Sequence, residues 1–264
     1  MAFLSFFQYL CVVNNIELNH LVIGYGRRAI GDGGLSASPL WGAGGGLSLT
    51  IEGGQLTCLI GPNGIGKSTL LRTLAGLQPA LSGRVLVGET DVARLPKNRL
   101  ARLVGIVLTA QPDVGNLTVD EVVALGRTPY TNFWGTLSAA DRRIVDESLQ
   151  LTGIAHLARK DFGRLSDGER QKVMIAKALA QQTAVILLDE PTAFLDYPSR
   201  IGTLQLLRRI AHEHQKAILL STHDIDQALQ QADRLVLLTQ QTVVSGSPQE
   251  VASTAEFRAF TQMR

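Results

Sequence analysis

The chain has 264 residues, of which 45% are hydrophobic and 18% charged, and its formal net charge is +2. A balance this close to neutral, with basic residues spread along the chain, excludes a strong electrostatic attraction to nucleic acid or to a membrane surface. Two cysteines, Cys11 and Cys58, cannot build a disulfide framework and fit a reducing compartment. The composition is that of an ordinary globular protein with one large domain or two small ones.

The first residues of the chain are unusually apolar. Residues 1–13 carry no charge, but they are shorter than the roughly 20 residues of a membrane span and lack the basic start of a secretory signal. The segment that begins at Asn14 already reads as the first strand of the domain. We therefore expect residues 1–13 to be an N-terminal extension, which is either native or the product of a misassigned start codon with Val12 or Val13 as the true first residue.

Short continuous apolar runs alternate with helical patterns along the chain. The runs are residues 56–60, 104–108, 185–188, 218–220 and 235–238. The helical patterns are residues 68–77, 139–151, 167–181 and 199–214. Runs this short and continuous are typical of strands buried on both faces of a parallel sheet, and their alternation with helices predicts an α/β fold.

Two regions interrupt the alternation. Residues from about 95 to 165 are mostly helical in pattern, which predicts a helical subdomain inserted between two strands of the main sheet. Residues 31–46 are rich in glycine and serine and are expected to form a flexible loop. We expect one main domain over residues 14–245 and a short C-terminal helical tail over residues 246–264.

A glycine-rich loop follows the first of the buried runs. Residues 61–68 read GPNGIGKS, which fits the phosphate-binding pattern G-x-x-x-x-G-K-[ST] and opens a helix. Glycines let backbone N–H groups converge on phosphate oxygens, and the helix N-terminus adds a positive partial charge. Lys67 is expected to reach the β- and γ-phosphates and Ser68 to offer its hydroxyl to Mg²⁺. The residues expected around the phosphates are Gly61, Pro62, Asn63, Gly64, Gly66, Lys67, Ser68 and Thr69.

Two carboxylates end the apolar run at residues 185–188. Ligands bind at the C-terminal edge of open α/β sheets, so Asp189 is expected to hold Mg²⁺ and Glu190 to orient the attacking water or accept its proton. The alternative is a strand cap with two solvated acids. His223 follows another apolar run, on what should be a neighbouring strand, and that position could face the γ-phosphate.

An ordered set of motifs makes the sequence specific for one family. LSDGERQ at residues 165–171 lies between GPNGIGKST and the later LLDEP and STHD, and with this set the chain resembles the ABC (ATP-binding cassette) ATPase family over residues 14–245. The resemblance implies a P-loop NTPase with a RecA-like core, an N-terminal antiparallel β part and the helical subdomain. It also implies hydrolysis of ATP to ADP and phosphate with Mg²⁺, the charge being held by Lys67, His223 and the metal.

In this family two subunits pair head to tail with two ATP molecules between them. By resemblance, Ser166 and Gly168 of the signature contact the γ-phosphate across the dimer, at the N-terminus of a helix. Asp196 matches the D-loop and is expected to cross the same interface. Tyr25 matches the aromatic residue that stacks on adenine, although a tyrosine near a β-turn is common.

The sequence departs from the family pattern at three places. Asp167 and Glu169 stand where glycine and glutamine are usual, and Asp167 should weaken phosphate binding unless its side chain turns away. The Q-loop glutamine, a metal contact in the family, falls on Thr109 without a gap, and Gln111 lies two residues on. Either Gln111 reaches the metal by a local shift or this loop signals differently. The loop at residues 31–46 is also longer than expected.

The chain contains one cassette and no apparent membrane segment, so a permease is expected to be a separate chain. The stretch NLTVDEVVALGRTPY at residues 116–130 resembles the ATPases of iron-siderophore, haem and cobalamin importers. The resemblance implies a homodimer bound to the cytoplasmic face of the inner (plasma) membrane, with a binding protein acting on it indirectly. The permease contact is expected near residues 125–130, unless these residues only pack the helical subdomain.

Two other classes stay open. One is a soluble ABC ATPase without a permease, and the other is a nucleotide-binding switch that does not hydrolyse ATP. The intact Glu190 argues against a switch, because a switch commonly loses its general base. The cargo is chosen by the permease and the binding protein, so this sequence does not name it.

Overall fold

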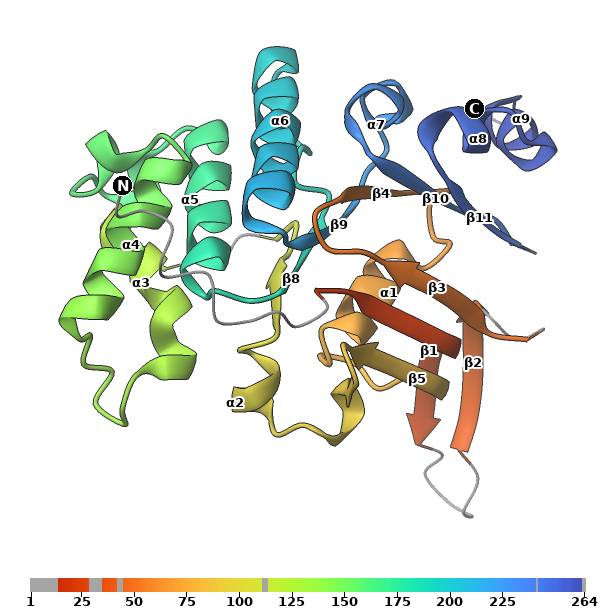
Figure 1. Ribbon diagram of the computed structural model, residues 1–264, viewed down its shortest axis with the longest axis horizontal. Helices are drawn as coiled ribbons and strands as arrows, with labels where there is room; N and C mark the ends of the chain where they lie inside the picture. Colours follow the sequence, from red (N-terminus) through yellow and green to blue (C-terminus); the bar gives the residue numbers. More distant parts are fainter. Residues whose placement is uncertain (1–13, 29–34, 42–44, 111–113, 241, 263–264) are drawn as a thin grey trace.

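The computed structural model describes residues 14–28, 35–41, 45–110, 114–240 and 242–262 (Figure 1). Its central element is a six-stranded sheet with the order β11-β10-β4-β9-β8-β7, parallel except for the pair β10–β11. The members are β4 (Leu56–Ile60), β7 (Val104–Val107), β8 (Val185–Asp189), β9 (Ala217–Ser221), β10 (Arg234–Leu238) and β11 (Val243–Gly246). The predicted parallel sheet of an α/β fold is therefore confirmed.

A second, antiparallel sheet is built around the long first strand. Its order is β2-β1-β5-β6, with β3 paired to β1 as well. The members are β1 (Ile16–Arg28), β2 (Leu35–Trp41), β3 (Leu47–Ile51), β5 (Ser82–Val87) and β6 (Thr90–Asp91). The first half of β1 pairs with β3 and β5, and the second half pairs with β2.

Helices cover both faces of the six-stranded sheet. The α-helices are α1 (Lys67–Leu74), α2 (Lys97–Leu100), α3 (Val119–Ala124), α4 (Ala139–Leu151), α5 (Asp167–Ala180), α6 (Tyr197–His214), α7 (Ile225–Gln231), α8 (Pro248–Ala252) and α9 (Ala255–Gln262). Short 3₁₀ turns are η1 (Val92–Arg94), η2 (Leu125–Tyr130), η3 (Ala155–Leu157) and η4 (Phe162–Arg164). In Figure 1, α3, α4 and α5 stand together at one end of the molecule, far from the antiparallel sheet. No helix of the described residues is both long and apolar enough to cross a membrane.

The core has two parts, one on each face of the six-stranded sheet. Successive side chains of a strand point to opposite faces, so the residues of β4 divide between the two parts. Cys58 and Ile60 pack in the cluster that contains α3–α9, whereas Leu59 packs in the cluster that contains α1, β1 and β5. The C-terminal helices belong to the first cluster through Val251, Phe257 and Phe260.

Cys58 lies in the middle of β4 with no exposed surface. Burial is the main cause that raises the pKa of its thiol to about 12, and the nearby Asp233 carboxylate raises it further. This side chain is a small hydrophobic filler of the core and not a reactive group.

The sequence predicts a flexible loop over residues 31–46, and for residues 35–41 this prediction is wrong. Leu35–Trp41 forms strand β2, which pairs with β1 in a register that places Tyr25 opposite Ser38 and Gly24 opposite Pro39. The backbone of the long strand β1 offers a template, and that tertiary pairing outweighs the loop-like composition. Pro39 is tolerated because β2 is the edge strand of its sheet. Residues 31–34 and 42–44 lie outside the described residues.

The helical subdomain expected over about residues 95–165 stays a proposal, and the strands of the main sheet bear on its limits. The range of 95–165 includes strand β7, which pairs with β8 in the main sheet. The described elements between β7 and β8 are the helices α3, α4 and α5 and the turns η2, η3 and η4. The described helices between β7 and β8 lie within residues 119–180, and we propose that they form the subdomain.

A buried lysine at the start of β9 makes stability depend on pH. Lys216 is 7% exposed, and its ammonium group donates a hydrogen bond of 2.5 Å to the Thr183 carbonyl. Burial lowers its pKa from 10.5 to about 8. Below pH 8 this lysine is charged in the folded and in the unfolded chain, and burying the charge lowers the free energy of unfolding. As pH rises from about 8 toward 10.5, the folded chain releases the proton that the unfolded chain retains, so stability increases.

We expect the free energy of unfolding of the wild-type chain to rise relative to Lys216→Met between pH 7.5 and pH 10, by up to about 3 kcal/mol. Urea unfolding of both chains at the two pH values gives the difference between their free energies of unfolding. The other titrating groups contribute equally to both chains and cancel in this difference. Parallel stability curves for the two chains would show that Lys216 keeps its ordinary pKa.

Candidate functional site

The glycine-rich loop joins β4 to α1 in a conformation that requires glycine. Gly61 has a φ of 153°, and a Cβ atom there would lie 2.5 Å from the carbonyl oxygen of Leu238 on β10. Gly66 precedes α1 with a φ of 105°. The loop therefore turns tightly at the edge of the sheet, and the N-terminus of α1 points toward the loop. This is the arrangement that the phosphate-binding pattern predicts.

Lys67 is the first residue of α1 and bends back over the loop. Its side chain is buried, and its ammonium group donates to the carbonyl oxygens of Gly61 and Pro62 at 2.9 and 3.1 Å. Asn63 and Gly64 are exposed at the tip of the loop, whereas Thr69 is buried on α1. The lysine thus holds a positive charge among the backbone groups that would surround a phosphate chain.

Oxygen atoms from three neighbouring elements gather around Asp189 at the end of β8. Its carboxylate oxygen Oδ1 accepts hydrogen bonds from the hydroxyls of Ser68 (2.9 Å) and Ser221 (2.8 Å). The Thr109 hydroxyl donates to the Asp189 backbone carbonyl at 2.8 Å. Hydroxyl and carboxylate oxygens beside a phosphate loop are the ligands that Mg²⁺ prefers, since it usually takes one or two carboxylates plus substrate phosphates. Ser68 and Asp189 therefore fit such a metal.

Glu190 and His223 lie side by side on neighbouring parallel strands. Asp189 of β8 is in register with Ser221 of β9, which confirms that His223 follows an adjacent strand. The imidazole Nε2 of His223 bonds to the carboxylate of Glu190, and the Glu190 amide donates to the Ser221 hydroxyl at 2.9 Å. Glu190 has a φ of 52°, a conformation that non-glycine residues rarely adopt and that is common at functional sites. Both side chains remain partly exposed, so a ligand can reach them.

The signature segment begins helix α5, and it explains one departure from the family pattern. Ser166 caps α5, its hydroxyl accepting from the Glu169 amide at 3.3 Å. The Glu169 carboxylate accepts in return from the amide (2.8 Å) and hydroxyl (2.9 Å) of Ser166. Both hydrogen bonds lower the pKa of Glu169, and the bond from the Ser166 amide has the larger effect. Glu169 therefore completes a capping box, a role that the S-x-x-E spacing could have revealed from the sequence.

The second unusual acid of the signature, Asp167, points toward a neighbouring arginine. Its carboxylate lies 3.8 Å from the guanidinium of Arg170 on the same helix, with 62% of the Asp167 side chain exposed. Gly168 follows, and a Cβ atom there would lie 3.5 Å from the Ser199 hydroxyl at the start of α6. The ion pair partly offsets the charge of Asp167.

A cavity of about 210 Å³ lies between the signature helix and the acid pair. It is lined by Thr109, Asp167, Gln171, Glu190, Ala193, Phe194 and Leu195. Next to it, Asp196 caps α6 by accepting from the Ser199 amide at 3.1 Å. Hydrogen bonds from Ser199 lower the pKa of Asp196, and the bond from the Ser199 side chain has the largest effect. Asp196 is thus held as an anion at the start of a helix.

Two of the expected site residues cannot be placed by their side chains. Tyr25 lies in β1, but its side chain is outside the described part of the molecule, and Gln111 is outside it altogether. Thr109, the ungapped alternative to Gln111, binds the carbonyl of Asp189 as described above. The adenine and Q-loop assignments therefore stay predictions.

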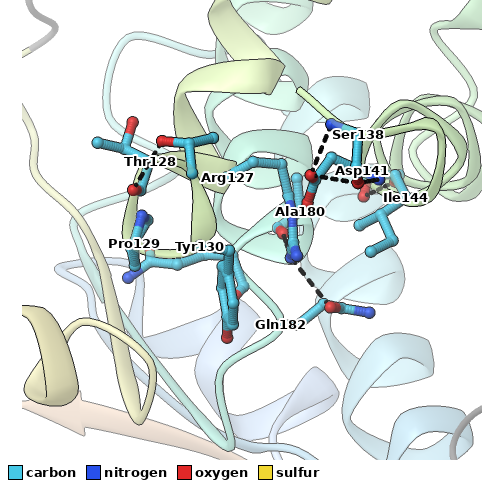
Figure 2. A network of polar contacts seen from close by, with 12 residues as sticks. Arg127, Thr128, Pro129, Tyr130, Ser138, Asp141, Ile144, Ala180 and Gln182 are labelled. Atoms are coloured by element: carbon cyan, nitrogen blue, oxygen red, sulfur yellow. Dashed lines mark hydrogen bonds and ion pairs between the residues drawn. The ribbon is translucent and has the colours of Figure 1, made fainter. Parts of the chain in front are cut away.

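Arg127 in η2 is buried, which the sequence alone did not indicate. Figure 2 shows Arg127 extending between Asp141 on α4 and Gln182 beyond α5. Its guanidinium, 5% exposed as a side chain, donates to the Asp141 carboxylate (2.9 Å), the Ala180 carbonyl (2.7 Å) and the Gln182 side chain (2.9 Å). It also lies 4.0 Å from the ring centre of Tyr130. This buried charge, paired with Asp141 and hydrogen-bonded through its Nε and Nη1 atoms, fixes η2 against α4 and α5.

Comparison with known proteins gives the same family by two routes. Residues 45–193 match the family model described as ABC transporter. The chain is 36% identical over 242 residues to the ferric enterobactin transport ATP-binding protein FepC of Escherichia coli, which covers 91% of this chain and 84% of that protein.

Two solved structures share the fold. One is described as a metal-chelate type ABC transporter in an inward-facing conformation (TM-score 0.76, 25% identity, 94% of this chain and 88% of that chain). The other is a dimeric ATP-binding cassette in a post-hydrolysis state bound to ADP and Pi (TM-score 0.71, 25% identity, 88% and 98%).

Proposed function

The chain belongs to the ABC transporter family as an ATPase, and on this premise we propose that it powers import of a metal chelate of the iron-siderophore, haem or cobalamin type. The observation that carries the proposal is the meeting of Lys67, Asp189 and Glu190 at one sheet edge, in a chain that is similar to FepC over 91% of its length. FepC is a ferric enterobactin transport protein, and its similarity supports the chelate class without naming the cargo.

ATP binding uses the loop and the start of α1. The backbone N–H groups of the loop and the ammonium group of Lys67 hold the phosphate chain. Gly61, Pro62, Asn63, Gly64 and Gly66 shape the loop, and Ser68 and Thr69 lie in the first turn of α1. Tyr25 stacks on the adenine. The phosphate-binding roles rest on the family pattern and on the loop geometry, and the role of Tyr25 rests on the family pattern alone.

Hydrolysis uses the groups at the ends of β8 and β9. The Glu190 carboxylate orients the attacking water and accepts its proton, and His223, which bonds to Glu190, holds that carboxylate and contacts the γ-phosphate. Ser68 and Asp189 would hold Mg²⁺, and by the family pattern Gln111 would be a further ligand. When bound, this metal would supply positive charge that offsets the negative charge of the phosphates during hydrolysis.

The active unit is a head-to-tail dimer of two copies. Ser166 and Gly168 of one copy contact the γ-phosphate held by the other, and the N-terminus of α5 supplies a positive partial charge for this contact. Asp196 crosses the same interface. The dimeric post-hydrolysis relative supports this arrangement, which opens and closes with each ATP cycle and moves the permease.

The permease contact lies at η2 and the loop that follows it. Leu125 is 42% exposed, and Phe133 and Trp134 are 95% and 84% exposed with their ring centres 5.5 Å apart. Exposed apolar groups of this size mark interaction surfaces, and the buried Arg127 gives the surface a rigid base. Contact with a separate permease places the chain at the cytoplasmic face of the inner membrane, and the extracytoplasmic binding protein acts only through that permease.

The test is Mg²⁺-dependent ATPase activity of the purified chain, alone and with its genomically adjacent permease in lipid vesicles. We expect activity of the chain alone and a several-fold rise with the permease. The same vesicles carrying Glu190→Gln give the background to subtract. Activity that is indifferent to the permease would favour a soluble ABC ATPase without a membrane partner, and a chain that binds ATP without hydrolysing it would be a nucleotide switch.

A further inference from the structure

The start of helix α6 is linked to the start of helix α7 by one arginine. Arg200 lies in the first turns of α6, and its Nε atom donates to the carbonyl oxygen of Leu195 at 2.8 Å. Its Nη1 atom lies 3.5 Å from the carboxylate of Asp224. Leu195 directly precedes Asp196, and Asp224 directly follows His223. One side chain thus contacts the neighbours of two proposed functional residues on different elements.

Each end of this bridge is held firmly in its own segment. The amide of Arg200 donates to the Asp196 carbonyl at 3.0 Å. Asp224 caps α7 by accepting from the Gln227 amide at 3.1 Å, and its own amide donates to the Thr222 hydroxyl at 3.1 Å. A displacement of the Leu195–Asp196 segment therefore moves Asp224 through Arg200, because neither end of the bridge lies in a flexible loop.

The bridge is poorly suited to a role in stability alone. The Arg200 and Asp224 side chains are 41% and 25% exposed, and exposed ion pairs contribute little to the stability of the fold. Arg200, His223 and Asp224 also line one open cavity of about 500 Å³, so the bridge lies at the edge of the site and not in the core.

We infer that Arg200 is a positioning residue that couples the Asp196 segment to His223. This inference rests on the proposed function, in which Asp196 meets the second copy and His223 holds Glu190 toward the γ-phosphate. When the dimer closes on the Asp196 segment, the Leu195 carbonyl moves with it, and Arg200 carries Asp224 and His223 into position. Arg200 thereby makes the geometry of Glu190 depend on contact with the partner copy.

The test compares Arg200→Ala with a matched control. Arg208 lies on the same helix, pairs with Asp233 at 3.0 Å and is 42% exposed as a side chain, but its partner lies away from His223. We expect Arg200→Ala to lower kcat for ATP hydrolysis about tenfold with less than a twofold change in KM, because small misplacements of reacting groups are costly. Arg208→Ala should leave kcat unchanged, and both variants should melt within about 3 °C of wild type.

A double-mutant cycle with Asp224→Asn separates the bridge from other effects. Asparagine keeps the cap of α7 and removes the charge that Arg200 contacts. Asp224→Asn should also lower kcat, and the double variant should be no slower than Arg200→Ala alone, because the two changes remove one interaction. Additive losses, an unchanged kcat in Arg200→Ala, or an equal loss in Arg208→Ala would each overturn the inference. A wild-type chain without ATPase activity would instead overturn the proposed function.

Discussion

Glu190→Gln is expected to lower kcat for ATP hydrolysis by about 10²–10³-fold while ATP binding persists. Glutamine has nearly the shape of glutamate and can still bond to His223, but it cannot accept a proton from the attacking water. The phosphate loop is untouched, so ATP still closes the dimer, and hydrolysis no longer reopens it. We expect the variant to elute as a dimer in Mg-ATP and as a smaller species without nucleotide, measured by size-exclusion chromatography.

The control for this variant is Glu213→Gln, which makes the same chemical change at an exposed position on α6. It should keep wild-type kcat and elution. If Glu190→Gln turned over ATP at the wild-type rate, the assignment of the acid pair would be wrong and the two carboxylates would be a solvated strand cap.

Lys67→Ala is expected to weaken ATP binding by about 100-fold or more. The variant removes a charge-assisted contact to the phosphates, and losses of 2–5 kcal/mol are usual when one partner of a buried charge contact is truncated. It also removes the donor that Gly61 and Pro62 share, so the loop loses its internal brace. Binding of a fluorescent ATP analogue, followed by titration with ATP, measures the affinity.

Lys97→Ala is the matched control, since Lys97 is exposed on α2 away from the loop. Its affinity should equal that of the wild-type chain. Thermal melting of both variants without nucleotide separates lost binding from lost folding. A Lys67→Ala chain that bound ATP at wild-type affinity would remove this lysine from the phosphate site.

The sequence predicts best the elements whose residues are dictated by local rules. Strand β4 is observed at Leu56–Ile60 as expected, because a short apolar run that ends at a glycine-rich loop favours a strand buried on both faces. Helix α4 matches its expected bounds, and a capping box between Ser138 and Asp141 fixes its start. The meeting of Ser68, Asp189 and His223 at one edge follows from the parallel order of β4, β8 and β9.

Features that depend on contacts between distant residues were not predictable in this way. Strand β2 exists because β1 offers it a pairing edge, and nothing in its composition indicates that. The burial of Arg127 depends on Ala180 and Gln182, which lie far along the chain on the other side of the subdomain. The bridge through Arg200 likewise joins segments that only the packing of α6 beside α7 brings together.

The buried thiol of β4 has a practical consequence for labelling chemistry. Alkylating and oxidising reagents attack the thiolate, and a Cys58 thiol with a pKa of about 12 forms almost none at neutral pH. Once Cys11 is replaced by serine, a cysteine introduced at an exposed position such as Phe194 becomes the one reactive thiol of the chain. A fluorophore or spin label attached there would report the approach of the two copies during the ATP cycle, without a background from the core.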